Sequence, residues 1–474
     1  MGCVSSKETR QILVPSKFCP NCRKLYTQRN WCKPCESRRF SEDFHNWTSG
    51  NTELDQFIRY TQLNSIAPLT FLEWIPYDKL EKIKEIGKGG FGIVYKATWN
   101  PGPKLYWDDL RSQWVRESEK NVALKRLNGS NHAVASFWQE LRQYHCINQN
   151  DHIRRCYGFS RDPKSKDYII VSELIEGDLY NYLSKNFNNL TWEKKLGIVY
   201  NIAHGLMTIH NAGFIHRNFH SGNILRCFNG SQHKTLISDL GQYRPPDKPI
   251  SHDEHCIYGV LPYVAPEVLC GFEYTEAADV YSFGMVMWEI STGQHPFHDR
   301  PHDEKLAWEI CNGLRPALTV ETPRCFMELM ESCWDANPKR RPDIRELEKI
   351  FMSWGWHMGI SQKHEVFDQF ISAENERQRL LKSDESEAFK KPHPEAIYKS
   401  RLLKFPELPK PVNRSSCLRT SAERSSFFFS GYEEMLLYKP INTYDSYERV
   451  ESREISFPVS DEDLAISFDN ISSV

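Results

Sequence analysis

A cluster of glycines between two alternating segments restricts the fold of this chain more than any other feature. Residues 83–99 (IKEIGKGGFGIVYKATW) alternate apolar and polar residues on both sides of the glycines, which predicts a strand, a tight turn and a second strand. Gly87, Gly89 and Gly92 fit the pattern G-x-G-x-x-G-x-V, which Val94 completes. Glycine lets the backbone approach phosphate oxygens with its N–H groups directed inward. Because a strand rather than a helix follows, the pattern argues against a dinucleotide-binding fold, and an ordinary hairpin turn is the alternative.

A lysine at the end of the next apolar strand favours the phosphate-binding interpretation. Residues 121–125 (NVALK) predict a short buried strand ending in Lys125, a position where a lysine is costly without a partner. Glu140 is the only carboxylate between Lys125 and Asp151, and it lies beside the apolar face of a predicted helix. These two side chains could form an ion pair. The alternative is a surface lysine and a surface glutamate that never meet.

Further motifs follow in a fixed order and identify a family. They are HRNFHSGN (216–223), DLG (239–241), APE (265–267), DVYSFGMVMWEI (279–290) and NPKRRP (337–342). With the glycine loop and the lysine, this series resembles the eukaryotic protein kinases over about residues 77–354. The resemblance implies an α+β fold of two lobes, a small antiparallel β lobe with one helix and a large helical lobe, joined by a hinge near 173–177.

The resemblance also implies a site for ATP and Mg²⁺. The residues that would bind the nucleotide are Gly87, Gly89, Gly92, Val94, Lys125, Glu140, Glu173 and Ile175. Asp239 and Asn223 would hold Mg²⁺, which prefers hard oxygen ligands. Asp279 would brace the loop at 216–223, and Glu267 would pair with Arg341. The partners implied are protein substrates or signalling proteins.

The strongest departure from the family pattern lies in the loop at 216–223. Where these kinases have His-Arg-Asp, the chain has Asn218, so the implied catalytic set is Asn218, Lys125, Asp239 and Asn223. A neutral amide cannot usefully take the proton of a substrate hydroxyl, and general base catalysis contributes about 10²–10⁴-fold, or roughly 3–5 kcal/mol. The sequence therefore favours a pseudokinase. The alternative is an active kinase acting on Ser/Thr or Tyr, because a loose transition state demands little help from a base.

Four cysteines near the N-terminus have the spacing of a metal site. Cys19, Cys22, Cys32 and Cys35 form C-x₂-C-x₉-C-x₂-C within residues 17–60. Two such turns present four thiolates to a tetrahedral Zn²⁺, which would stabilise a segment too small for its own core. A redox pair and unpaired thiols are the alternatives. The basic residues nearby allow nucleic-acid binding, but a solvated face or a surface that docks on the kinase-like region is favoured. The chain as a whole has 60 basic and 62 acidic side chains, without the basic excess of nucleic-acid binders.

The first residues match a lipidation signal. MGCVSSKE fits M-G-x-x-x-[ST], which predicts myristoylation of Gly2, and Cys3 is a candidate for palmitoylation. Two acyl chains give stable anchoring, so we expect a cytoplasmic protein peripheral to a membrane; a chance match is the alternative. The sequence shows no apolar run of membrane-spanning length.

The remaining segments are expected to be less regular. Residues 1–16 are predicted to be an acylated, disordered N-terminus. Residues 358–474 predict one short helix and then a mostly disordered tail, because Pro and Ser are scattered among few periodic apolar residues. The charged insertion at about 100–120 predicts a solvated excursion or a partner surface.

Overall fold

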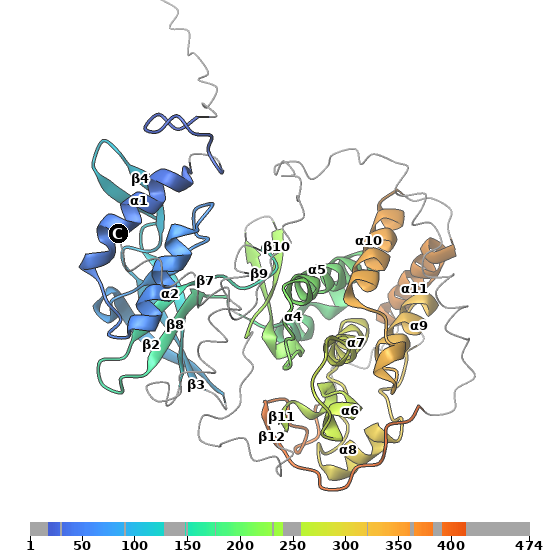
Figure 1. Cartoon of the computed structure of the whole chain (residues 1–474). Coiled ribbons are helices and arrows are strands. Elements are labelled where there is room, and N and C mark those ends of the chain that lie inside the picture. Colours follow the sequence, from blue (N-terminus) through green and yellow to red (C-terminus); the bar gives the residue numbers. More distant parts are fainter. Residues whose placement is uncertain are drawn as a thin grey trace, which may run out of the picture. The chain divides into compact units, whose positions relative to one another are not determined.

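The computed structural model describes residues 18–28, 31–89, 92–127, 147, 150–175, 177–229, 232–239, 257–319, 321–360, 365–382 and 391–413. It confirms the predicted α+β class: a lobe built on an antiparallel sheet comes first in the chain, and a lobe of helices follows (Figure 1). The predicted helix that includes Glu140 lies outside the described residues. Within the described part of the chain, no helix has the length and apolar character needed to cross a membrane.

The main sheet has six strands in the order β1-β7-β8-β6-β3-β2. Their bounds are β1 (Glu73–Trp74), β2 (Leu80–Gly89), β3 (Gly92–Trp99), β6 (Lys120–Leu127), β7 (Cys156–Arg161) and β8 (Tyr168–Glu173). Five strands pair antiparallel, whereas β1 pairs parallel with β7 through Glu73↔Gly158 and Trp74↔Phe159. The approach of β1 requires a glycine opposite, because a Cβ on Gly158 would lie 1.9 Å from the Glu73 carbonyl oxygen.

The helical lobe is organised around buried aromatic side chains. Its helices are α4 (Leu179–Asn186), α5 (Trp192–Asn211), α6 (Pro266–Leu269), α7 (Glu276–Thr292), α8 (Glu304–Cys311), α9 (Arg324–Cys333), α10 (Ile344–Ile360) and α11 (Glu365–Lys382). The Phe370 ring of α11 lies 5.7 Å from Trp192 and 5.6 Å from Trp354. The helix α11, in the segment where one short helix was predicted, therefore packs one of its faces on this lobe.

Short strands position the loops of the helical lobe. The hairpin of β9 (Ile224–Asn229) and β10 (Gln232–Ile237) lies between the loop at 216–223 and Asp239. A second pair joins β11 (Ile257–Gly259) to β12 (Arg401–Leu403), with Ile257 opposite Leu403. Within the tail that was expected to be mostly disordered, residues 391–413 are therefore ordered on this lobe, and residues 414–474 lie outside the described residues.

The insertion at 100–120, expected to be a solvated excursion or a partner surface, is ordered and contacts another part of the same chain. It forms the hairpin β4 (Lys104–Asp108) and β5 (Gln113–Arg116), which packs on the N-terminal region containing α1 (Lys33–Asp43) and α2 (Thr52–Leu63). The Trp114 ring stacks on Phe40 with their centroids 4.6 Å apart. Lys104 donates to Asp43 at 3.0 Å, and Arg39 pairs with Asp109. Charges in the insertion thus serve contacts within the chain.

Candidate functional site

The glycines Gly87, Gly89 and Gly92 lie on the two predicted strands, β2 and β3, and residues 90–91 between them lie outside the described residues. In the register of β2 and β3, Gly87 lies opposite Val94 and Gly89 opposite Gly92. Gly92 is required by the sheet itself, because a Cβ there would lie 2.2 Å from the carbonyl oxygen of Arg126 on β6. A Cβ on Gly87 would meet no described atom within 4 Å. Gly87 is therefore free of packing demands and available for close approach by a ligand.

Lys125 on β6 reaches the start of the DLG motif. Its register is fixed by Val94 of β3 and Ile170 of β8, and its ammonium donates to the Asp239 carboxylate. Burial alone would raise the pKa of Asp239, but the charge and hydrogen bond of Lys125 prevail and hold that pKa below its usual value. Asp239 has a φ of 62°, a strained backbone conformation that often marks functional sites. The predicted partner Glu140 lies outside the described residues.

A buried carboxylate holds the loop that contains Asn218. Asp279 of α7 is 1% exposed, and it accepts hydrogen bonds from the backbone N–H groups of His216 at 2.7 Å and Arg217 at 2.9 Å. The ring of His210 lies 3.0 Å from the same carboxylate. The bracing role implied for Asp279 by the resemblance has this physical basis: three contacts converge on one desolvated charge.

Asn218 and Asn223 are hydrogen-bonded to each other, and Asn223 also to Ser238, the residue before the DLG motif. The Asn223 side-chain amide donates to the backbone carbonyl of Asn218 at 2.8 Å. The backbone N–H and the hydroxyl of Ser238 each donate to the Asn223 carbonyl at 2.9 Å. Asn218 and Asn223 are thereby hydrogen-bonded to each other, and Asn223 is hydrogen-bonded to Ser238, the residue that directly precedes Asp239. The amide oxygen of Asn218 accepts from the hydroxyl of Ser400 at 3.1 Å, a residue that the sequence did not single out.

The hinge residues occupy the end of β8. The N–H of Glu173 donates to Arg155 at 2.9 Å, and its carbonyl accepts from the guanidinium of Arg154 at 2.9 Å. A carbonyl oxygen has two lone pairs, so this one can still accept a second hydrogen bond from a ligand. Ile175 follows as a half-buried residue outside the regular strand. The two predicted adenine contacts thus lie at the exit of the sheet.

The predicted pair of Glu267 and Arg341 is present and buried. Two guanidinium nitrogens donate to the two carboxylate oxygens, each at 2.7 Å. This bidentate geometry joins α6, which contains Pro266 and Glu267 of the APE motif, to the segment before α10. Its role is structural, as the resemblance implies.

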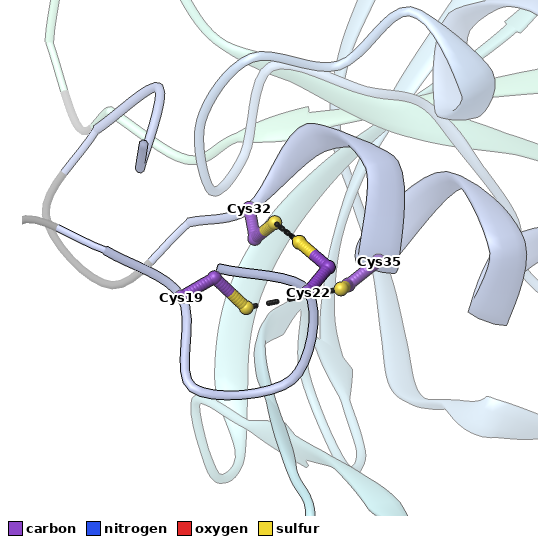
Figure 2. Close-up of side chains that lie close together, drawn as sticks. All are labelled: Cys19, Cys22, Cys32 and Cys35. Atoms are coloured by element: carbon purple, nitrogen blue, oxygen red, sulfur yellow. Dashed lines mark hydrogen bonds between the residues drawn. The ribbon is translucent and has the colours of Figure 1, made fainter. Parts of the chain in front are cut away.

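The four N-terminal cysteines converge as their spacing predicts (Figure 2). Their sulfur atoms all lie within 4.8 Å of one another, with Cys22 and Cys32 at 3.4 Å and Cys19 and Cys35 at 3.8 Å. Sulfur atoms bound at about 2.3 Å to a tetrahedral Zn²⁺ are separated by roughly 3.8 Å. A tight turn presents the first pair, and the start of α1 presents the second. The donor set and the separations fit a structural zinc ion.

Comparisons with known proteins identify the family of this chain. The family model described as protein tyrosine and serine/threonine kinase matches residues 80–351. The chain is 33% identical over 311 residues to "Probable serine/threonine-protein kinase roco5" of Dictyostelium discoideum, an alignment covering 62% of this chain and 10% of that protein. It is 29% identical over 285 residues to mitogen-activated protein kinase kinase kinase 7 of Homo sapiens, covering 59% and 42%. A third relative, Cyclic GMP-binding protein C of Dictyostelium discoideum, is 29% identical over 311 residues, covering 58% and 11%. The chain thus aligns with less than half the length of each relative.

Proposed function

Because the chain belongs to the protein tyrosine and serine/threonine kinase family, we propose that it binds ATP and Mg²⁺ but transfers phosphate poorly. The observation that carries this proposal is the contrast between Asp239 and Asn218. Asp239 is ionised and paired with Lys125, and an ionised carboxylate is the kind of oxygen ligand that Mg²⁺ prefers. Asn218 presents an uncharged amide at the position where the family has the proton acceptor.

The residues of the site divide the work of nucleotide binding. Lys125 and Asp239 neutralise each other, and each would exchange that partner for a ligand group of opposite charge. The lysine would hold the α- and β-phosphates, while Asp239 and Asn223 would supply oxygen ligands to Mg²⁺. When bound, ATP supplies a phosphoryl group on a good leaving group. The chain's own contribution is positioning and charge.

An active enzyme is the second candidate, and one observation favours it. The Ser400 hydroxyl donates to the amide oxygen of Asn218, which therefore still orients an alcohol even though it takes no proton. A loose transition state needs orientation more than a strong base. Under this alternative, the γ-phosphate passes to Ser/Thr or Tyr of protein substrates.

Transfer from labelled ATP to a protein substrate separates these candidates. Wild type, Asn218→Asp and Lys125→Met are compared, with the lysine variant as the control that lacks a phosphate ligand. Asn218→Asp should be faster than wild type by about 10²–10⁴-fold. A wild type that matches Asn218→Asp and exceeds Lys125→Met would overturn the pseudokinase proposal in favour of the active enzyme.

The cysteine cluster is proposed to hold one structural Zn²⁺. The support is the convergence of four thiols and their placement at the start of α1, next to aromatic packing that includes Trp31 and Trp114. Metal analysis of the purified full chain should find about one equivalent of zinc. Cys35→Ser should lose it, whereas Cys325→Ser, at a buried cysteine on α9 away from the cluster, should retain it. Equal zinc in both variants would refute the site.

Membrane attachment through the N-terminus stays a proposal from the sequence, because Gly2 and Cys3 lie outside the described residues. It is supported by the match of the first residues to an acylation signal with an adjacent cysteine. Gly2→Ala should move the protein from the membrane fraction to the soluble fraction of a cell extract. Unchanged fractionation would contradict the proposal. Partners would then be signalling proteins or substrates at a cytoplasmic membrane face.

A further inference from the structure

Residues 391–413 lie on the helical lobe and are attached on both sides of β12. Upstream, the N–H of His302 donates to the Glu395 carbonyl at 3.0 Å, and the N–H of His393 donates to the His298 carbonyl at 2.8 Å. Downstream, the N–H of Val412 donates to the Cys311 carbonyl at 2.9 Å. Main-chain contacts on both sides hold the residues between them in one register.

Between these attachments the segment adds a strand to the region before the APE motif. Tyr258 lies opposite Leu402, and Gly259 lies opposite Arg401, in an antiparallel pair. Leu403 is 2% exposed, whereas Leu402 is 44% exposed. Addition of a strand is a common way for a protein to hold an extended peptide, with affinity from the backbone and selectivity from alternate side chains.

Ser400, the residue just before this strand, contacts the loop at 216–223. Ser400 is separated from Asn218 by 182 positions, yet its hydroxyl donates to the Asn218 side-chain oxygen at 3.1 Å. In this family that position is where the side chain meets the alcohol of a substrate. Ser400 therefore lies where an acceptor hydroxyl would lie.

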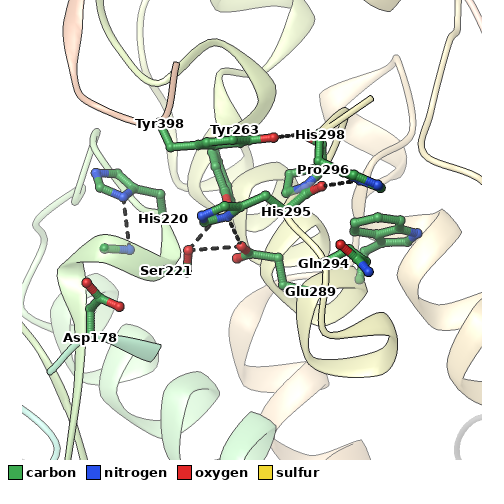
Figure 3. A network of polar contacts seen from close by, with 12 residues as sticks. Asp178, His220, Ser221, Tyr263, Glu289, Gln294, His295, Pro296, His298 and Tyr398 are labelled. Carbon is green, nitrogen blue, oxygen red and sulfur yellow. Dashed lines mark hydrogen bonds and ion pairs between the residues drawn. The ribbon is translucent and has the colours of Figure 1, made fainter. Parts of the chain in front are cut away.

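Tyr398 anchors the segment two residues earlier. Its ring stacks on His295 with centroids 3.8 Å apart, and it meets the His302 ring edge-on at 4.8 Å. Its hydroxyl donates to the Pro296 carbonyl at 3.1 Å. Figure 3 shows Tyr398 beside His295, which is itself held by the buried Glu289 carboxylate. The ring thus enters a surface that internal polar contacts have already fixed.

The loop at 216–223 is part of the same network. Ser221, which directly follows His220, donates to Glu289 at 3.1 Å, and its hydroxyl lies 3.3 Å from that of Tyr263 (Figure 3). Glu289 thereby connects the catalytic loop to the His295 ring that Tyr398 covers. The loop that contains Asn218 and the ring on which Tyr398 stacks are consequently connected through Glu289.

We propose that residues 398–403 act as an intramolecular substrate mimic, which occupies the acceptor-peptide site with Ser400 at the acceptor position and Tyr398 as its anchor. This goes beyond nucleotide binding and does not depend on whether phosphate is transferred. It assigns the site a ligand class: an extended peptide with Tyr two residues before a Ser and an apolar residue three residues after it. A segment tethered in the same chain acts at an effective concentration on the order of millimolar, so free peptides must displace it.

The test measures displacement in the full chain. The probe is a fluorescein-labelled synthetic peptide with the sequence of residues 395–406, followed by anisotropy. Tyr398→Ala and Leu403→Asp weaken the tethered segment without altering the surface that it covers. Each should bind the probe at least about tenfold more tightly than wild type. Leu402→Ala, at an exposed position of the same strand, is the matched control and should bind as wild type does.

Hydrogen exchange provides a second readout on the same proteins. Fragments covering 257–259 and 398–403 should be protected in wild type and Leu402→Ala, and should exchange faster in the two displaced variants. Equal probe binding by all four proteins, or rapid exchange of 398–403 in wild type, would overturn the proposal. A melting shift with Mg²⁺ and ATP, measured in parallel, reports on nucleotide binding alone, so failure of the proposed function is distinguished from failure of this inference.

Discussion

The two halves of the site differ in charge and in what they contact. The nucleotide half contains Lys125 and Asp239, a charged pair joined across two elements. The acceptor half presents the neutral amide of Asn218, whose oxygen is engaged by Ser400 of the same chain. Binding a nucleotide and moving its phosphate are separate tasks, and this chain keeps the residues for the first while altering the second. The following predictions test that contrast.

The largest effect is expected from restoring the acceptor half in two ways at once. Asn218→Asp supplies a base, and Tyr398→Ala releases the segment that covers the site. Asn218→Asp alone should transfer phosphate to the 395–406 peptide faster than wild type by about 10²–10⁴-fold, and the double variant should be faster still. Initial rates with saturating ATP measure this. If Asn218→Asp alone equals the double variant, occupancy of the site by the segment has no role in transfer.

The nucleotide half should lose its ligand when its carboxylate is neutralised. Mg²⁺–ATP at about 100 times its dissociation constant should stabilise wild type by roughly 2.7 kcal/mol, seen as a higher melting temperature. Asp239→Asn should remove most of this shift, because the metal loses a charged oxygen ligand. Asp78→Asn, at a side chain that is 75% exposed, should keep it. A full shift in Asp239→Asn would mean that the nucleotide half is not organised as proposed.

Two glycines in the nucleotide half should separate packing from ligand approach. Gly92→Ala forces a Cβ to within 2.2 Å of the Arg126 carbonyl oxygen, so the unliganded protein should lose about 1–3 kcal/mol of stability. Gly87→Ala meets no described atom within 4 Å, so its unliganded melting temperature should match that of wild type. Only its shift with Mg²⁺–ATP should shrink. Differential scanning calorimetry with and without nucleotide measures both, and equal destabilisation by the two variants would contradict this division.

The acceptor half should make the protein sensitive to mild acid. Burial lowers the pKa of His220 from 6.5 to about 3, so below about pH 6.5 the unfolded chain binds a proton that the folded chain refuses. As the pH falls below that value, His220 should therefore lower the free energy of unfolding by at most about 1.4 kcal/mol per pH unit. The lowered pKa of Asp239 also stabilises the fold. That contribution is complete above the unfolded pKa of 3.8 and is lost as the pH falls below that value.

His220→Asn isolates that titration. The asparagine oxygen can accept the hydrogen bond that the His220 ring accepts from the Gly222 N–H at 3.1 Å, but it does not titrate. Urea unfolding between about pH 6.5 and 4.5 should give a smaller slope of stability against pH for the variant than for wild type. Identical slopes would show that this histidine takes up its proton in the folded state.

The local chemistry of the chain could be predicted from short stretches of sequence. Three features depend on neighbours a few residues apart, where backbone geometry determines the outcome. They are the pairing of the strands that contain Gly87 and Val94, the place of Lys125 in a strand, and the convergence of four cysteines. Loss of the carboxylate at Asn218 was likewise visible from residue identity alone. For these features, chemistry follows from residue type and spacing.

Three associations were decided only by the tertiary structure. The strand β1 joins β7 because Gly158 leaves room for it, the insertion packs its Trp114 on Phe40, and Ser400 meets Asn218 across 182 positions. Polar, weakly periodic segments such as 391–413 bury little apolar surface of their own. Their order comes from distant parts of the chain, which offer the edge of β11, the His295 ring and the side-chain oxygen of Asn218. The sequence does not show which distant residues come together in the folded chain, so only the tertiary structure reveals that Ser400 contacts Asn218.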